Sequence, residues 1–277
     1  QFGDSSGHRS CGVEFVLDER VTQGFSGSRQ DLYWKIGIAL DDVNAATEAL
    51  STRLGGQPLS KGSQFEDVGF LMHMRDPVGF PIELLQTTMQ QNAAKRRELV
   101  QENSVGSDAL KSFGQQNSPQ PVIGQITIRT NDSKKSLDFY CRELGMTLLC
   151  TEDVSQYGFW LYFVGFLEAG EEVPASGGGN SGVSHREWCY QRPYTTLEIQ
   201  EHVKEERSSS PSREWDGNAV EPRTGSQPRF ERESTCEGIT LYVPDHATEI
   251  ELTDPDGLKV QLRHARQFER GPLESKK

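Results

Sequence analysis

Four polar residues stand inside strand-like apolar runs, where their side chains could reach a pocket. Gln125 and Arg129 share one face of "QITIRT", because alternate residues of a strand point to the same side. Glu83 lies inside "FPIELL" and Glu198 inside "TTLEIQ". An unpaired buried carboxylate is very costly, so each Glu is either solvated or buried with a partner. The alternation alone leaves both interpretations open for all four residues.

The elements that must position these residues form a repeat. The stretches "YWKIGIALDDVNAATEALSTRLGG" (33–56) and "GQITIRTNDSKKSLDFYCRELGM" (124–146) share one order of features. An alternating strand is followed by an Asp-containing helix start, a helix with an apolar stripe, and Gly at the helix stop. In the second copy, Asp132 or Ser133 is the predicted N-cap and Gly145 the predicted stop.

A second repeated element is Asp-Pro-x-Gly, in "DPVGFPIELL" (76–85) and "DPDGLKVQL" (254–262). It predicts a tight turn, and the strand-like runs on either side of each copy predict a hairpin. Two complete units therefore follow one order: a strand, a helix and about three strands. Each ends with a Glu at the same place, Glu83 or Glu198, and this recurrence favours a pocket over a solvated face.

The predicted domain organisation has two parts joined by a linker. Residues 1–90 contain a truncated first module, of which 11–19 is the last strand, and a complete module. Residues 91–120 form the linker, and residues 121–268 contain a complete module and a shortened last module that has lost its helix. The segments 175–184 and 203–235 are predicted to be flexible insertions, the second of which is charged and could meet protein partners.

Composition and charge argue against some classes of partner and indicate a cellular compartment. The net charge of -12 argues against nucleic acid or an anionic membrane as the main partner. No apolar run approaches the roughly 20 residues of a membrane span. Five scattered cysteines without C-x-x-C spacing indicate reduced thiols, hence an intracellular, reducing compartment. Because residue 1 is Gln rather than Met, the chain is interpreted as processed or a fragment, in the cytoplasm or an organelle after removal of a targeting peptide.

Several of these stretches resemble glyoxalase I (lactoylglutathione lyase). "QITIRTNDSKKSLDFYCRELGMTLL", "FWLYFVGFLEAGEEVP" and "TTLEI" resemble its N-terminal half, and "KIGIALDDV" with "DPVGFPIEL" resembles its C-terminal half. "WDGNAVEPRTG" is similar to the segment that joins the halves. The resemblance covers roughly residues 12–90 and 120–265. It implies an α+β vicinal-oxygen-chelate fold, in which paired βαβββ modules form half-barrel sheets around a divalent metal, Zn or Ni.

The resemblance also implies a site and a reaction. Gln125, Glu198 and Glu83 would hold the metal, and Arg129 would bind the carboxylate of a glutathione-derived substrate. The expected reaction isomerises the methylglyoxal–glutathione hemithioacetal to S-lactoylglutathione through a metal-bound enediolate. The two glutamates are the expected catalytic residues, with Glu83 as the base that transfers the proton.

The chain departs from the family pattern at one decisive position. Lys35 stands where the family has a His ligand, and a protonated ammonium has no lone pair for a metal. At the other potential site, the family's His falls on Gly238 and its second Glu on Gln261. Glu14 is then the one family-like ligand expected at that site. Two hypotheses follow: a glyoxalase I-type lyase, or a catalytically lapsed relative used as a binding module or structural subunit.

Two histidines on predicted strands are candidate replacement ligands. His73 precedes the first Asp-Pro-x-Gly turn and His202 follows Glu198 by four residues. Each is interpreted as a surface or packing histidine. A dioxygenase of the same fold would need two histidines and one carboxylate, a set that the inner strands do not offer.

Overall fold

The computed structural model describes ten stretches of the chain: 31–53, 57–58, 60–77, 79–89, 121–167, 170–174, 185–192, 194–203, 238–243 and 249–264. The predicted strand at 11–19 with Glu14, the linker 91–120, the insertion 175–184 and all of 203–235 except Val203 lie outside these stretches. In the described stretches, no helix combines the length and apolarity needed to cross a membrane.

The first module runs from β1 to β5. Its elements are β1 (Tyr33–Leu40), α1 (Val43–Arg53), β2 (Gln57–Pro58), β3 (Ser63–Phe65), β4 (Gly69–Arg75) and β5 (Pro81–Gln86). Helix α1 starts at Asp42, whose Oδ1 accepts a hydrogen bond from the backbone N of Ala45 at 3.0 Å. The turn between β4 and β5 is closed by Asp76 Oδ1, which accepts from the backbone N of Phe80 at 2.8 Å.

The second module repeats this order. Its elements are β6 (Val122–Thr130), α3 (Ser133–Leu137), the π-helical segment η2 (Asp138–Glu143), β7 (Thr147–Val154), the 3-10 turn η3 (Ser155–Tyr157), β8 (Phe159–Gly165), α4 (His185–Gln191) and β9 (Thr196–His202). Asp132 is the N-cap of α3, and Gly145 ends the helical segment with a φ of 74°. The sequence predicted one continuous α-helix, whereas its second half is π-wound, and α4 was not predicted.

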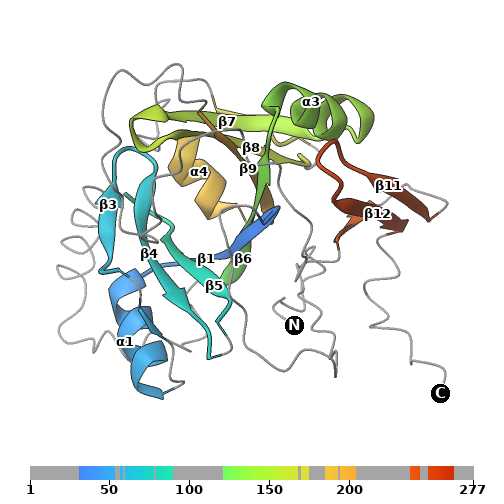
Figure 1. Cartoon of the computed structure of the whole chain (residues 1–277). Coiled ribbons are helices and arrows are strands. Elements are labelled where there is room, and N and C mark those ends of the chain that lie inside the picture. The colour runs from blue at the N-terminus through green and yellow to red at the C-terminus, as the bar shows by residue number, and fades with distance from the viewer. Residues whose placement is uncertain are drawn as a thin grey trace, which may run out of the picture.

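The two modules form one curled sheet in the order β2-β4-β5-β1-β6-β9-β8-β7, with β3 on the side of β4 (Figure 1). In each module the first strand runs parallel to the last, β1 to β5 and β6 to β9. At the centre, β1 and β6 pair antiparallel with Ile36 opposite Ile126. We call this pairing the seam. The predicted α+β half-barrel of the vicinal-oxygen-chelate, or glyoxalase, fold is therefore confirmed.

A glycine in β1 allows β1 and β6 to approach each other closely at the seam. Gly37 lies opposite Gln125, and a Cβ on Gly37 would stand 2.8 Å from both the Gln125 Cβ and the Leu85 Cδ1. The Gln125 Cβ is fixed to its backbone, so a side chain at position 37 would force β1 and β6 apart, and Gly37 makes room for Gln125 beside β5.

A separate three-stranded sheet, β10-β12-β11, packs against the second module (Figure 1). Its strands are β10 (Ile239–Val243), β11 (Ile250–Thr253) and β12 (Lys259–His264). Leu258 and Val260 join Phe139 and Tyr140 in one apolar cluster. The second Asp-Pro-x-Gly turn packs against the second module through two hydrogen bonds. Just before α3, Thr130 Oγ1 donates to Asp256 Oδ2 at 2.5 Å. In η2, the Tyr140 hydroxyl donates to Asp254 Oδ2 at 2.9 Å.

Candidate functional site

Strand pairing at the seam places four predicted site residues on one face of the sheet. Directly paired residues share a face. Gly37 is paired with both Glu83 and Gln125, and Thr127 with both Lys35 and Glu198. Since Lys35 and Gly37 are two residues apart on β1, both sets point to the same side. The structure therefore brings the four predicted residues together, each at most 3% exposed: Lys35, Glu83, Gln125 and Glu198.

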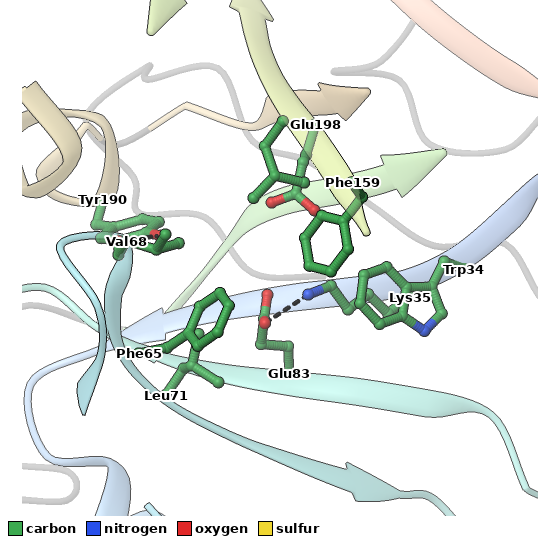
Figure 2. A pocket seen from close by; sticks show the side chains of 10 residues that line it. Trp34, Lys35, Phe65, Val68, Leu71, Glu83, Phe159, Tyr190 and Glu198 are labelled. Carbon is green, nitrogen blue, oxygen red and sulfur yellow. Dashed lines mark hydrogen bonds and ion pairs between the residues drawn. The ribbon is translucent and has the colours of Figure 1, made fainter. Parts of the chain in front are cut away.

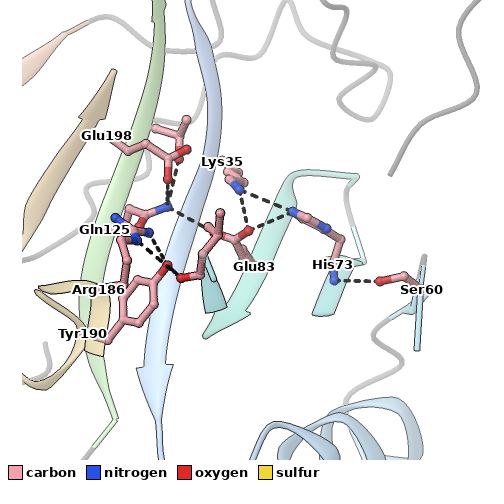
Figure 3. Close-up of polar contacts among 10 residues, drawn as sticks. Lys35, Ser60, His73, Glu83, Gln125, Arg186, Tyr190 and Glu198 are labelled. Carbon is pink, nitrogen blue, oxygen red and sulfur yellow. Dashed lines mark hydrogen bonds and ion pairs between the residues drawn. The ribbon is translucent and has the colours of Figure 1, made fainter. Parts of the chain in front are cut away.

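An ion pair forms the first half of this cluster (Figure 3). Lys35 Nζ donates to Glu83 Oε1 at 2.5 Å, and the ammonium also lies 4.0 Å from the centre of the Trp34 ring. His73, the cross-strand partner of Glu83 on β4, places Nε2 3.1 Å from the same Glu83 oxygen and 3.4 Å from Lys35 Nζ. Lys35, Glu83 and His73 all come from the first module.

Gln125 links the carboxylates of the two modules. Its Nε2 donates to Glu83 Oε2 at 3.1 Å and to Glu198 Oε2 at 2.7 Å, with Thr127 Oγ1 at 3.3 Å (Figure 3). The side-chain nitrogen rather than the oxygen faces the carboxylates, because both of them require a donor. The other oxygen of Glu198 is buried and has no hydrogen-bond partner among the described residues.

The surroundings set the protonation of the cluster. Burial would raise the pKa of Glu83, but the Lys35 ammonium and the His73 ring outweigh it and hold that pKa at about 2. Burial, reinforced by Lys35, lowers the pKa of His73, so the ring is neutral at pH 7. Burial raises the pKa of Glu198; Lys35 opposes this rise and Glu83 adds to it. The ammonium charge is thus balanced mainly by Glu83.

A small cavity opens between Lys35, Glu83 and Glu198 (Figure 2). The rest of its wall is aromatic and aliphatic: Trp34, Phe65, Val68, Leu71, Phe159, Leu161 and Tyr190. It offers about 10 Å³ to the centre of a water molecule. That is close to the room one water needs.

Helix α4, which sequence analysis missed, closes one side of this cavity. Arg186 is fully buried, with its guanidinium 3.4 Å from the centre of the Phe163 ring. It donates to the Val68 carbonyl at 3.3 Å and to the hydroxyl of Tyr190, a residue of the cavity wall. The spacing of Arg186, Cys189 and Tyr190, three and four residues apart, is the helical signal that could have revealed α4.

The other predicted residues fall in different surroundings. Arg129 is buried, where it donates to Gln200 Oε1 at 3.3 Å and to the Asp31 carbonyl at 3.0 Å, so its substrate-binding role stays a prediction. His202 ends β9, opposite Phe159. Gln261, at the second potential site, donates to Glu251 at 3.1 Å. His73, interpreted from the sequence as a surface or packing residue, is buried and also places Nε2 3.1 Å from Glu83 Oε1.

We tested whether these residues suit the divalent metal that the fold family implies. Glu83 and Glu198 could supply oxygen ligands and His73 a nitrogen, but Gln125 turns its N–H groups to both carboxylates. The Lys35 ammonium already lies against Glu83, where it would repel a second cation. Over the described stretches, no group of three or more His, Cys, Asp or Glu residues is arranged to hold a metal ion. With Lys35 protonated, the residues do not fit a metal.

The match to a protein-family model concerns the second module. Residues 122–185 match the family model "Glyoxalase/Bleomycin resistance protein/Dioxygenase superfamily". The matched residues run from β6 to the first residue of α4 in the second module. A lactoylglutathione lyase from Pseudomonas aeruginosa is 47% identical over 53 residues, which are 19% of this chain and 30% of that protein. The chain thus aligns with less than a third of the length of this relative.

Solved structures with a similar chain course include glyoxalase I from Zea mays and methylmalonyl-CoA epimerase from Mycobacterium tuberculosis. The former is 19% identical with a TM-score of 0.47, and the match covers 86% of this chain and 69% of that chain. The latter is 14% identical with a TM-score of 0.34, over 63% of this chain and 91% of that chain.

Proposed function

We propose that this chain is a catalytically lapsed glyoxalase-type protein, in which the Lys35 ammonium stands in place of the metal ion. It would act as a metal-free binding module or structural subunit. The observation that carries the proposal is the buried contact of 2.5 Å between Lys35 Nζ and Glu83 Oε1. This contact supplies the positive charge that two converging carboxylates would otherwise take from a metal.

The hydrogen bonds around the cluster support this proposal. Glu83 already accepts from Lys35 and Gln125 and lies in contact with His73. A base that must take a proton from carbon needs a lone pair facing the substrate, and here both oxygens of Glu83 face protein donors. The cavity beside it has room for about one water, which further favours a role other than turnover of a glutathione conjugate.

A second candidate is lactoylglutathione lyase of the glyoxalase I type, acting on the methylglyoxal–glutathione hemithioacetal. The segment that is 47% identical to the Pseudomonas aeruginosa enzyme favours it, as does the meeting of Gln125, Glu83 and Glu198. This function requires Lys35 to leave Glu83, and the cavity to open around Trp34 and Tyr190.

Metal content and turnover distinguish the two candidates. We would purify wild type, Lys35→His and, as a control at an exposed lysine, Lys135→His. Each would be incubated with Zn or Ni, desalted, and measured by mass spectrometry and by hemithioacetal turnover. We expect far less than one metal per chain and no turnover for wild type and Lys135→His. Lys35→His should retain metal, since it supplies a neutral nitrogen and removes a cation. One tightly held metal in wild type, with turnover that a chelator abolishes, would overturn the proposal in favour of the lyase.

A further inference from the structure

A second cation, Arg186, lies inside the half-barrel on the face of the sheet that carries the two glutamates. Arg186 is 2% exposed, and its guanidinium carbon lies 3.4 Å from the centre of the Phe163 ring. Phe163 on β8 is directly paired with Glu198 on β9, so these two side chains are neighbours on one face. In the view of Figure 3, Arg186 and Lys35 lie on opposite sides of Glu198.

The direct contacts of Arg186 balance its charge only in part. Its Nε lies 3.7 Å from Glu152 Oε1, which is longer than a hydrogen bond, and donates to the Val68 carbonyl at 3.3 Å. Its Nη2 donates to the hydroxyl of Tyr190. Its Nη1 is buried and has no hydrogen-bond partner among the described residues. A cation buried in this way requires further negative charge nearby.

Glu198 has the complementary need for positive charge. Its Oε2 accepts from Gln125, whereas its Oε1 is buried without a hydrogen-bond partner in the described part of the chain. Burial raises the pKa of Glu198. Lys35 and Arg186 favour the charged form and lower that pKa, whereas Glu83 raises it. Since Lys35 is already bonded to Glu83 at 2.5 Å, Arg186 supplies the further positive charge beside Glu198.

We propose that Arg186 is a second internal cation that, together with Lys35, keeps the half-barrel free of metal. Lys35 balances Glu83 and Arg186 balances Glu198, so each glutamate has a positive partner within the chain. A divalent ion that entered between the two glutamates would be repelled by both cations. This inference rests on the function proposed above and extends it, because metal exclusion then depends on two residues. Lys35→His restores only part of the affinity for metal while Arg186 is present.

A second buried arginine, six residues further along the chain, provides a matched control. Arg192 is 3% exposed, and its guanidinium lies 5.3 Å from the centre of the Trp188 ring. Unlike Arg186, it donates from Nε and Nη2 to the two oxygens of Glu171, at 2.6 and 3.0 Å. Its charge is therefore balanced by a carboxylate outside the cluster, and its loss should not change the affinity for a metal between the two glutamates.

Zinc affinity in a Lys35→His background tests the role of Arg186. Titration calorimetry on the full chain would compare Lys35→His alone with the same variant carrying Arg186→Met, Arg186→Lys or Arg192→Met. Arg186→Met removes the charge but leaves a long side chain to pack on the Phe163 ring. It should raise the zinc affinity at least about tenfold, because one repelling charge is lost. Arg186→Lys, which keeps the charge, and Arg192→Met should bind zinc no more tightly than Lys35→His alone.

Each failure has its own signature. If Arg186→Met binds zinc no more tightly than Lys35→His alone, or if Arg186→Lys gains as much as Arg186→Met, the charge of Arg186 does not exclude metal and the inference is overturned. Tight zinc binding by the wild-type chain would instead overturn the function proposed above.

A second measurement keeps the inference testable if Arg186→Met does not fold. In the otherwise wild-type chain, urea unfolding would compare Arg186→Met and Glu198→Gln with the variant that carries both changes. We expect the combined variant to be more stable than Arg186→Met, because it leaves neither buried charge without its partner. Recovery of folding in the combined variant, where Arg186→Met alone is unfolded, would support the pairing of Arg186 with Glu198. A combined variant no more stable than Arg186→Met would overturn that pairing.

Discussion

Replacing Lys35 by Met tests whether its ammonium is a structural cation. The change keeps most of the side-chain length but removes the positive charge beside Glu83. Glu83 would keep its contacts with His73 and Gln125, yet lose the partner that contributes most to lowering its pKa. Removing one partner of a buried ion pair typically costs about 3–5 kcal/mol, because the other charge is left uncompensated. We expect a loss of about that size in the free energy of unfolding at pH 7.

A double-mutant cycle isolates the pair. Glu83→Gln removes the negative charge, and the combined Lys35→Met/Glu83→Gln variant makes the cluster neutral at these two positions. Since neutral replacement of a whole buried pair is often harmless, the double variant should recover most of the loss, with a coupling energy of about 2 kcal/mol or more. Urea unfolding gives all four free energies. Lys135→Met is the control, because it removes an exposed ion pair with Asp132. The two side chains are 72% and 43% exposed, respectively. Loss of this pair should lower the free energy of unfolding by under about 1 kcal/mol.

Two results would refute this reasoning. If Lys35→Met costs no more than Lys135→Met, the ammonium is not compensating a buried charge. If the two single changes add without coupling, Lys35 and Glu83 do not form the pair that the 2.5 Å contact describes.

Two further predictions concern His73 and Tyr140. Because the pKa of His73 is lowered by folding, the unfolded chain binds a proton that the folded chain does not below about pH 6.5. Stability should therefore fall with decreasing pH by up to about 1.4 kcal/mol per unit from this residue. Urea unfolding at pH 7.5 and 5.5 should show a shallower fall in His73→Gln, and equal falls would contradict a neutral buried ring. Tyr140→Phe removes the buried hydrogen bond to Asp254 and should cost about 1–2 kcal/mol, with faster amide exchange in β12. Tyr157→Phe, which loses an exposed bond to Glu66, should leave that exchange unchanged.

The features that were predictable from sequence are those with local signals. Asp-Pro-x-Gly marks both hairpins, and Asp132 and Gly145 mark the ends of the helical segment, because turns and caps depend on neighbouring residues. The meeting of Glu83 with Gln125 was expected only from the resemblance to glyoxalase I, because alternation left a solvated face equally open; the pairing of β1 with β6 brings the two side chains together.

The parts that were missed depend on pairing between distant segments. His73 sits alone in the apolar run "VGFLMHM", and only the register of β4 on β5 shows that it faces Glu83. Helix α4 is short, and its role comes from the packing of Arg186 on Phe163, more than twenty residues earlier. The π-wound turn at Asp138–Glu143 has no strong local signature, because an α-helix would satisfy the same apolar stripe.

The ion pair of Lys35 with Glu83 also bears on how the chain reaches its native state. In a protein whose site is completed by a metal, folding is coupled to metal supply, and a starved cell accumulates incomplete protein. We propose that the Lys35 ammonium takes the place of the metal, so that the cation is part of the polypeptide from the moment of synthesis. Lys35 and Glu83 belong to one module, so their charges can neutralise each other before the second module joins at the seam. Maturation should then be independent of metal supply, and refolding with a chelator should match refolding with added Zn in rate and yield.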